Sequence, residues 1–183
     1  NYEAAQVKLF GEMALKGYVY RGLKPVHWSP SSQTALAEAE LEYPDGHISQ
    51  SIYVGFQITQ LPDVLINTLS EQGIGILDSE SKLNRKLKIA VWTPTPWTIP
   101  ANLAIAVNEK IEYVFASDEK NQLILVASDL LLNFSEIIGT TLSPKVRVKG
   151  NLLKGINYKH PLFDRISPVV IGGDYINTEN GTG

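Results

Sequence analysis

Residues 87–127 read LKIAVWTPTPWTIPANLAIAVNEKIEYVFASDEKNQLILVA, and their hydrophobic pattern is the main indication of fold class. Leu87, Ile89 and Val91 alternate with other residues at the period of two that is typical of a half-buried β-strand. Three further β-like runs follow, at 103–107, 111–116 and 122–127. Polar and proline-rich turns separate the runs. Several short strands in close succession indicate a mainly β protein.

The flanking sequence extends this pattern on both sides. Apolar residues alternate over 52–58, Val alternates with Lys or Arg over 145–149, and 169–171 is typical of a buried strand. Helices are predicted over 3–16, 62–72 and 128–138, the last with Ser128 or Asp129 as its N-cap. Residues 34–43 fit a helical turn or a strand equally well.

The predicted order of elements excludes a doubly wound α/β fold, because helices do not follow each strand. It favours a barrel or a packed sandwich. We therefore predict a mainly β fold, with a β-barrel core and peripheral short helices.

Composition excludes several classes of protein. With 44% hydrophobic and 19% charged residues, the chain of 183 residues is unlike a disordered protein. A net charge of −3 argues against a domain that wraps duplex DNA. The absence of cysteine excludes disulfides and thiolate metal sites. No apolar run reaches about 18 residues, so no membrane span is predicted. The chain begins at Asn1 without a methionine, and we expect it to be a piece of a larger protein.

Common catalytic motifs are missing from the sequence. The three histidines, His27, His47 and His160, are far apart, so a structural zinc is not expected and each is more typical of a surface or satisfied core residue. There is no nucleophile elbow and no phosphate loop. Glutamates at 38, 40 and 42 share one face of a possible strand, a pattern more typical of a solvated edge than of an acid–base pair.

The segment Trp92–Asn102, WTPTPWTIPAN, has a different character. Its three prolines fix φ and bias the preceding residues towards extended geometry, so the backbone is stiff. It displays three threonine hydroxyls and one carboxamide, from Thr93, Thr95, Thr98 and Asn102. Such a loop can hold a water or a substrate oxygen without ionised groups. The alternative is a proline-rich connection between two strands.

Several separate segments resemble isoleucyl-tRNA synthetase. Residues 17–28 followed by 34–43 are similar to the entry into the large insertion of that enzyme. Residues 92–102 resemble the threonine-rich editing motif of the insertion, and Pro-Trp-Thr at 96–98 favours the isoleucine enzyme over its valine and leucine relatives. Residues 160–183 also resemble this family. The resemblance covers essentially the whole chain in the expected order.

The resemblance implies one editing domain over residues 1–183, with 1–17 and 181–183 near its junctions with the rest of a class I synthetase. Such a domain receives the 3′ end of isoleucine tRNA and hydrolyses the ester of mischarged valine, with a water positioned by the threonine motif and by ribose hydroxyls of the substrate. Editing is needed because one methylene distinguishes the two amino acids by only about 1–3 kcal/mol. The resemblance implies no cofactor or metal in this domain, ATP and Mg in the parent enzyme, no DNA or membrane partner, and a location in the bacterial cytoplasm or an organelle.

Individual roles also follow from the resemblance. Thr93 and Thr95 match the first and third threonines of the motif and are expected to contact the water, the ester or the valine as catalytic residues. Trp97, Thr98 and Asn102 are expected to bind substrate. For Trp97 a purely structural role is an equal alternative, and Asn102 could instead cap a strand end.

Two departures from the family keep a second hypothesis open. The middle position of the threonine triplet is Pro94, which has neither a hydroxyl nor an N–H. The family's editing aspartate and a nearby histidine follow a Gly-Thr-Gly like that at 181–183. We therefore expect weak or no hydrolysis by this chain alone. The alternatives are a non-catalytic docking module for the tRNA 3′ end and a structural insertion. Where some relatives have cysteines, this chain has Ser29 and Ser32, so no metal is implied there.

A short cationic segment precedes the threonine strand. Lys82, Arg85, Lys86 and Lys88 lie within seven residues that contain no acid. Only the single-stranded tRNA end has to enter the domain, so a few local cations could contact its phosphates. The alternative is a strand edge protected by lysines.

Overall fold

The computed structural model describes residues 1–75 and 86–183. Contacts divide the chain into two compact units, Asn1–His47 and Ile48–Gly183. The mainly β core lies in the second unit. That residues 1–183 together make one editing domain of a larger enzyme remains a prediction.

The first unit contains a helix and a small hairpin. Helix α1 (Tyr2–Leu15) confirms the helix predicted over 3–16. Strands β1 (His27–Ser29) and β2 (Thr34–Leu36) pair in antiparallel fashion, and a 3₁₀ turn, η1 (Glu38–Glu40), follows. The placement of the glutamates on one strand face was wrong, because Glu40 accepts a hydrogen bond from the backbone N–H of Ala37 and so stabilises the turn instead.

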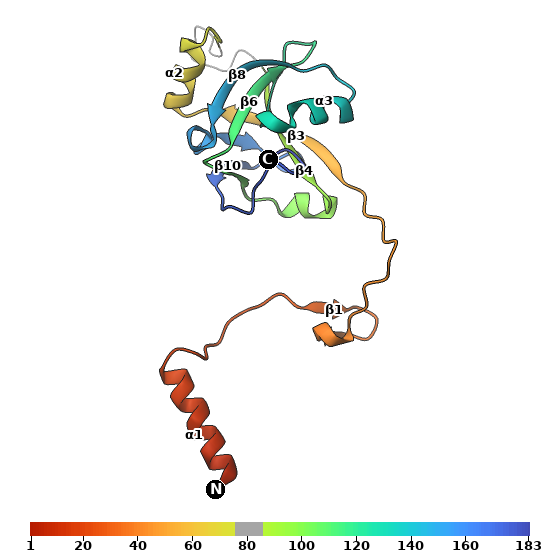
Figure 1. The fold of residues 1–183 in the computed structure, drawn as a ribbon, viewed down its shortest axis with the longest axis vertical. Coiled ribbons are helices and arrows are strands. Elements are labelled where there is room, and N and C mark those ends of the chain that lie inside the picture. Colours follow the sequence, from red (N-terminus) through yellow and green to blue (C-terminus); the bar gives the residue numbers. More distant parts are fainter. Residues whose placement is uncertain (76–85) are drawn as a thin grey trace. The chain divides into compact units, whose positions relative to one another are not determined.

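The second unit is built on a mixed sheet of eight strands in the order β5-β10-β9-β3-β4-β7-β6-β8 (Figure 1). The strands are β3 (Ile52–Gln60), β4 (Leu87–Thr93), β5 (Ile105–Val107), β6 (Glu112–Ser117), β7 (Leu123–Ala127), β8 (Ser143–Lys149), β9 (Asn157–Lys159) and β10 (Ile166–Ile171). The pairs β4–β7 and β5–β10 are parallel, and the others are antiparallel. The mainly β prediction is confirmed.

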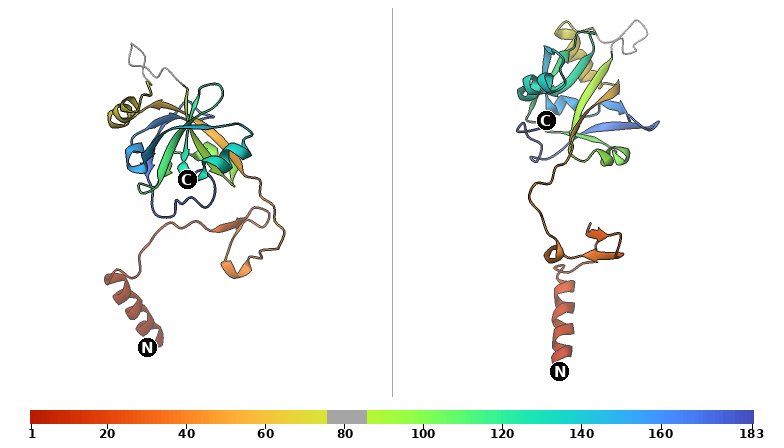
Figure 2. Two further views of the ribbon diagram at one scale, coloured as in Figure 1. Left: turned by 45° about the horizontal axis from the view of Figure 1, so that its top comes forward. Right: turned by 90° about the vertical axis from the view of Figure 1, so that its right-hand side faces the viewer.

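Short helices lie around this sheet (Figure 2). They are α2 (Asp63–Glu71), α3 (Leu131–Ile137) and three 3₁₀ turns, η2 (Pro96–Ala101), η3 (Ser128–Leu130) and η4 (Gly150–Leu153). The predicted N-cap of the third helix was wrong. No side-chain cap bond forms there, and Ser128 Oγ is buried without a hydrogen-bond partner among the described residues. The chain enters α3 through η3, whose backbone bonds replace the cap.

The core is formed by alternate residues of the strands together with Leu65 and Leu69 of α2. Phe115 on β6 is fully buried between Leu125 on β7 and Val146 on β8. On β8 the valines are buried and the cationic residues are exposed, as the alternation predicts. This burial of apolar surface is the main stabilising contribution to the fold.

Two buried tyrosines predict a dependence of stability on alkaline pH. Burial raises the pKa of Tyr113 and of Tyr158 above the ordinary value of 10.0. Between the unfolded and the folded pKa, the unfolded state has lost a proton that the folded state retains. The free energy of unfolding should therefore be unaffected by these groups below pH 10 and fall as pH rises above it. Urea unfolding of wild type and Tyr113→Phe from about pH 8 to about pH 11 measures this. A Tyr113→Phe curve as steep as that of wild type would contradict it.

Candidate functional site

The end of β4 and the turn that follows bring three threonine hydroxyls together. Thr93 is the last residue of β4, and its Oγ1 accepts a hydrogen bond from the Thr95 backbone N–H at 3.1 Å. The Thr95 Oγ1 lies 3.2 Å from Thr93 Oγ1 and 3.4 Å from Thr98 Oγ1. The Thr98 hydroxyl donates to the Thr95 carbonyl oxygen at 2.7 Å. The three hydroxyls therefore form one connected chain.

The direction of these hydrogen bonds shows which protons remain available. A carbonyl oxygen can only accept, so the Thr98 proton is committed to the Thr95 carbonyl. The protons of Thr93 and Thr95 are not committed to any backbone acceptor among the described residues. These two hydroxyls can therefore donate along the chain or to a bound oxygen.

The proline-rich segment is not extended throughout, which corrects the expectation from its sequence. Residues Pro96–Ala101 form η2, with Pro96 at its start. A proline φ near −65° suits the first residues of a helical turn as well as extended chain, and the absent N–H is not needed there. The turn places Thr98 beside Thr95 and brings the chain round to Asn102.

Asn102 is fixed from several directions. Its Nδ2 donates to the Ala104 carbonyl oxygen at 2.9 Å, and its Oδ1 accepts from the Tyr158 hydroxyl at 2.5 Å. The guanidinium of Arg165 donates to its backbone carbonyl oxygen. The carboxamide is thus held against β9 and cannot rotate freely.

A cavity of about 450 Å³ lies beside this turn. Its lining residues are Phe56, Val91, Thr93, Thr98, Ile99, Ala101, Asn102, Leu103 and Ala104. None of them carries an ionisable side chain. The walls are apolar, with two threonine hydroxyls and one carboxamide as polar groups. Such a lining suits a small aliphatic group attached to polar oxygens.

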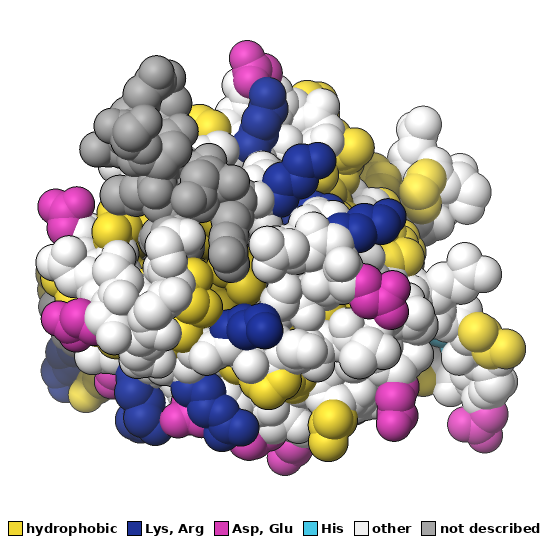
Figure 3. All heavy atoms as spheres, turned by 90° about the horizontal axis from the view of Figure 1, so that it is seen from above, with side chains coloured by type: hydrophobic (Ala, Val, Ile, Leu, Met, Phe, Trp, Pro, Cys, Tyr) yellow, Lys and Arg dark blue, Asp and Glu magenta, His cyan; other side chains and the backbone are white. Residues whose placement is uncertain are grey.

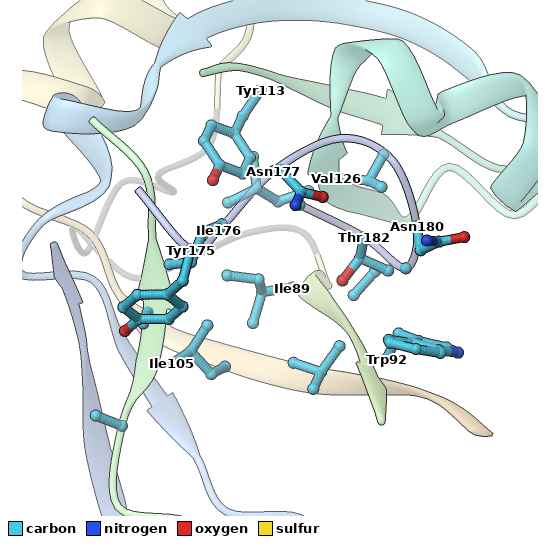
Figure 4. A pocket seen from close by; sticks show the side chains of 17 residues that line it. Ile89, Trp92, Ile105, Tyr113, Val126, Tyr175, Ile176, Asn177, Asn180 and Thr182 are labelled. Carbon is cyan, nitrogen blue, oxygen red and sulfur yellow. The ribbon is translucent and has the colours of Figure 1, made fainter. Parts of the chain in front are cut away.

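A second cavity, of about 460 Å³, shares Val91 and Ala104 with the first. Figure 4 shows Trp92 and Tyr175 on opposite sides of it, with Thr182 between. A Cβ on Gly181 would lie 2.9 Å from the Trp92 ring, so the chain passes this ring closely. The Ala127 N–H donates to the Thr182 carbonyl oxygen at 2.9 Å. The Gly-Thr-Gly segment therefore packs against the strand that carries Thr93.

The other residues expected at the site lie as follows. Trp97 is 71% exposed and is not among the residues that line either cavity. Its predicted substrate contact stays a prediction. Pro94, which replaces a threonine of the family motif, contributes its carbonyl oxygen as the acceptor for the Ser49 hydroxyl at 2.8 Å.

Some of the cationic residues predicted to contact tRNA phosphates are described by the structure, and these lie away from the threonine turn. Lys82 and Arg85 are outside the described residues, and Lys86 directly precedes β4. Lys88 is near the start of β4 and Thr93 at its end, a separation of about 16 Å along a strand. The Lys88 side chain lies over Gly55 of β3. Figure 3 shows cationic and acidic side chains interspersed on one face.

Sequence reasoning did not identify three residues that support the site. Tyr158, His160 and Arg165 all contact the turn at 99–102. The prediction that His160 is a satisfied core histidine is confirmed, because it is 2% exposed and both ring nitrogens have partners. The sequence signal for this role was the position of His160 directly before Pro161 and directly after β9, a strand that the sequence pattern did not predict.

Residues 1–75 and 86–183 contain neither a cluster of metal ligands nor a helix that could span a membrane. No group of three or more His, Cys, Asp or Glu side chains there could hold a metal ion. None of the helices in those ranges is both long and apolar enough to cross a bilayer.

Comparisons with known proteins agree with the resemblance in the sequence. The isoleucine–tRNA ligase of Prochlorococcus marinus strain NATL2A is 62% identical over all 183 residues, and that of Parasynechococcus marenigrum strain WH8102 is 55% identical. The chain spans about a fifth of the length of these relatives, 19% in both cases.

Solved structures share the fold. The crystal structure of GlLeuRS-CP1 has a TM-score of 0.58 at 17% identity, with 72% of this chain and 53% of that chain covered. The editing domain of Plasmodium falciparum cytosolic leucyl-tRNA synthetase has a TM-score of 0.55 at 13% identity, with 74% and 59% covered. The fold is thus that of these synthetase editing domains.

The family model described as tRNA synthetases class I (I, L, M and V) matches residues 1–146. The resemblance to isoleucyl-tRNA synthetase is confirmed by these matches. With most of its residues covered by that model, the chain belongs to the class I tRNA synthetase family.

Proposed function

We propose that this chain is the editing segment of an isoleucyl-tRNA synthetase and hydrolyses the ester of valine mischarged on isoleucine tRNA. The observation that carries the proposal is the linked set of hydroxyls of Thr93, Thr95 and Thr98 at a cavity whose other lining is mainly apolar. The parent enzyme, its tRNA partner and its place in the cytoplasm belong to the same proposal.

The apolar lining suits an aliphatic amino-acid side chain. The side chains of Phe56, Val91 and Leu103 offer apolar contact to an aliphatic amino acid. The site that charges the tRNA distinguishes valine from isoleucine by only about 1–3 kcal/mol, because the two amino acids differ by one methylene. A second cavity that accepts valine and excludes isoleucine supplies the additional discrimination.

The hydroxyls suit the positioning of a water. Attack on an ester places negative charge on the former carbonyl oxygen, and neutral donors stabilise that charge in a water-poor site. Thr93 lines the cavity and has an uncommitted proton, so it is the best placed of the three to donate. No side chain that lines the cavity is ionisable, so none can activate its two threonine hydroxyls as nucleophiles. We therefore assign the attack to a water positioned by the threonine hydroxyls and by ribose hydroxyls of the substrate, and the proton of that water passes to the ribose oxygen that leaves. ATP and Mg serve the parent enzyme outside this domain.

The test is release of valine from isoleucine tRNA by the longer synthetase that contains this chain, here called the full-length synthetase. Thr93→Val removes the hydroxyl but keeps the shape, and we expect release to slow about tenfold. Thr95→Val should have a smaller effect, because its hydroxyl reaches the cavity only through its neighbours. Isoleucine should be spared by wild type.

The matched control is Thr68→Val on α2, whose hydroxyl is exposed and donates to the Val64 carbonyl oxygen. It should release valine at the wild-type rate. If the wild-type enzyme binds valyl-tRNA but releases no valine, the hydrolytic proposal fails and the non-catalytic docking module replaces it. The 183-residue chain alone should release valine weakly or not at all.

A further inference from the structure

The hydrogen bonds of Asn102 fix which way its carboxamide faces. The Ala104 carbonyl oxygen can only accept, so the amide nitrogen must be the atom beside it, at 2.9 Å. The amide oxygen therefore faces Tyr158, and the tyrosine must be the donor. A flipped amide would place its oxygen against the Ala104 oxygen and leave both without a hydrogen bond.

Tyr158 is built into the core as a fixed donor. Its side chain is fully buried, and its ring lies 5.3 Å from that of Phe56, which itself lines the cavity. Burial raises the pKa of the phenol, so it keeps its proton at neutral pH. On β9, Tyr158 is paired with Ile58 of β3 and Ser167 of β10, so its backbone is held on both sides.

Two neighbours of Tyr158 hold the backbone on which Asn102 sits. The N–H groups of Leu162 and Phe163 both donate to Nδ1 of His160 at 3.1 Å, so Nδ1 is an acceptor. The ring proton is then on Nε2, which donates to the Ile99 carbonyl oxygen at 2.8 Å. Arg165 donates to the carbonyl oxygen of Asn102. The β9–β10 segment thus fixes both the main chain and the side chain of this turn.

One Asn102 N–H is left for a ligand. The amide nitrogen has two protons, and only one is used by Ala104. Because Asn102 lines the cavity, a fixed amide presents this N–H in one place, whereas a freely rotating amide would present nitrogen and oxygen in turn. A donor contributes most to catalysis when it needs no reorientation during the reaction.

We propose that Tyr158 is a positioning residue that fixes the Asn102 amide as a hydrogen-bond donor to the substrate. This inference rests on the proposed editing function. Tyr158 does not touch the substrate and acts only through Asn102.

A double-mutant cycle in the full-length synthetase tests the inference. Tyr158→Phe keeps the ring and removes the donor, and we expect kcat for valine release to fall about tenfold with KM changed less than about twofold. In the Asn102→Ala background, Tyr158→Phe should have no further effect on kcat. The matched control is Tyr53→Phe, a half-buried tyrosine that packs on Phe134 and should leave kcat unchanged.

An equal loss from Tyr158→Phe with and without Asn102 would overturn the proposal, as would a wild-type kcat in the single variant. Nitrogen-15 NMR of the Asn102 side chain in this chain separates this outcome from failure of the proposed function. The two amide protons should exchange places slowly in wild type and faster in Tyr158→Phe. If that difference is seen while the full-length enzyme releases no valine, the editing function fails and the positioning survives. Equal exchange in both proteins overturns the positioning.

Discussion

In the full-length synthetase, Asn102→Ala is expected to slow the release of valine by about 100-fold or more, a larger effect than that of any single threonine variant. Loss of one preorganised donor to a developing oxyanion typically costs about 10²–10³ in kcat. The proposed role of Asn102 is that of such a donor, and Tyr158 and Arg165 hold its side chain and its backbone in place. Initial rates with valyl-tRNA at saturating concentration measure the effect.

The control for this variant is Asn157→Ala. Asn157 donates from its Nδ2 to Gln60 Oε1 at 3.0 Å and does not line the cavity at the threonine turn. It should keep the wild-type rate. If Asn102→Ala lowers the rate no more than Asn157→Ala does, the carboxamide has no part in hydrolysis and its role is only to hold the turn.

The second large effect concerns stability, and Phe115→Ala should lower the free energy of unfolding of the chain by about 3–5 kcal/mol. Phe115 is fully buried in β6 and is paired with Leu125 on one side and Val146 on the other. Removal of the ring leaves a cavity in the hydrophobic core, which the neighbouring strands cannot fill because their register is fixed by hydrogen bonds. Urea unfolding followed by circular dichroism measures the loss.

Leu132→Ala is the matched control for the core variant. Leu132 lies on α3 and is 80% exposed, so its truncation removes little buried area and should change the free energy of unfolding by less than about 0.5 kcal/mol. A loss at Phe115 as small as that at Leu132 would show that the sheet is not packed as described.

Most of the strands and helices could be predicted from the amino-acid pattern. Alternation with a period of two located β3, β4 and β8, because the side chains of a strand alternate between a more buried and a less buried face. Strand β6 was predicted as a β-like run at 111–116, and it is buried on both faces. Residues 62–72 were predicted as a helix, and α2 occupies Asp63–Glu71. The threonine motif was recognisable as a motif because its residues are close in sequence.

The tertiary structure alone decided the rest. Strand β9 has only three residues and forms because β3 and β10 offer it partners on both sides, not because of its own propensity. Asn102 and Tyr158 are 56 positions apart, and their hydrogen bond depends on the register of β9 and the path of η2. The cavity likewise joins Phe56 of β3 to the turn after β4. Local sequence specifies dihedral preferences, whereas these contacts depend on strand register and on packing between segments far apart in the chain.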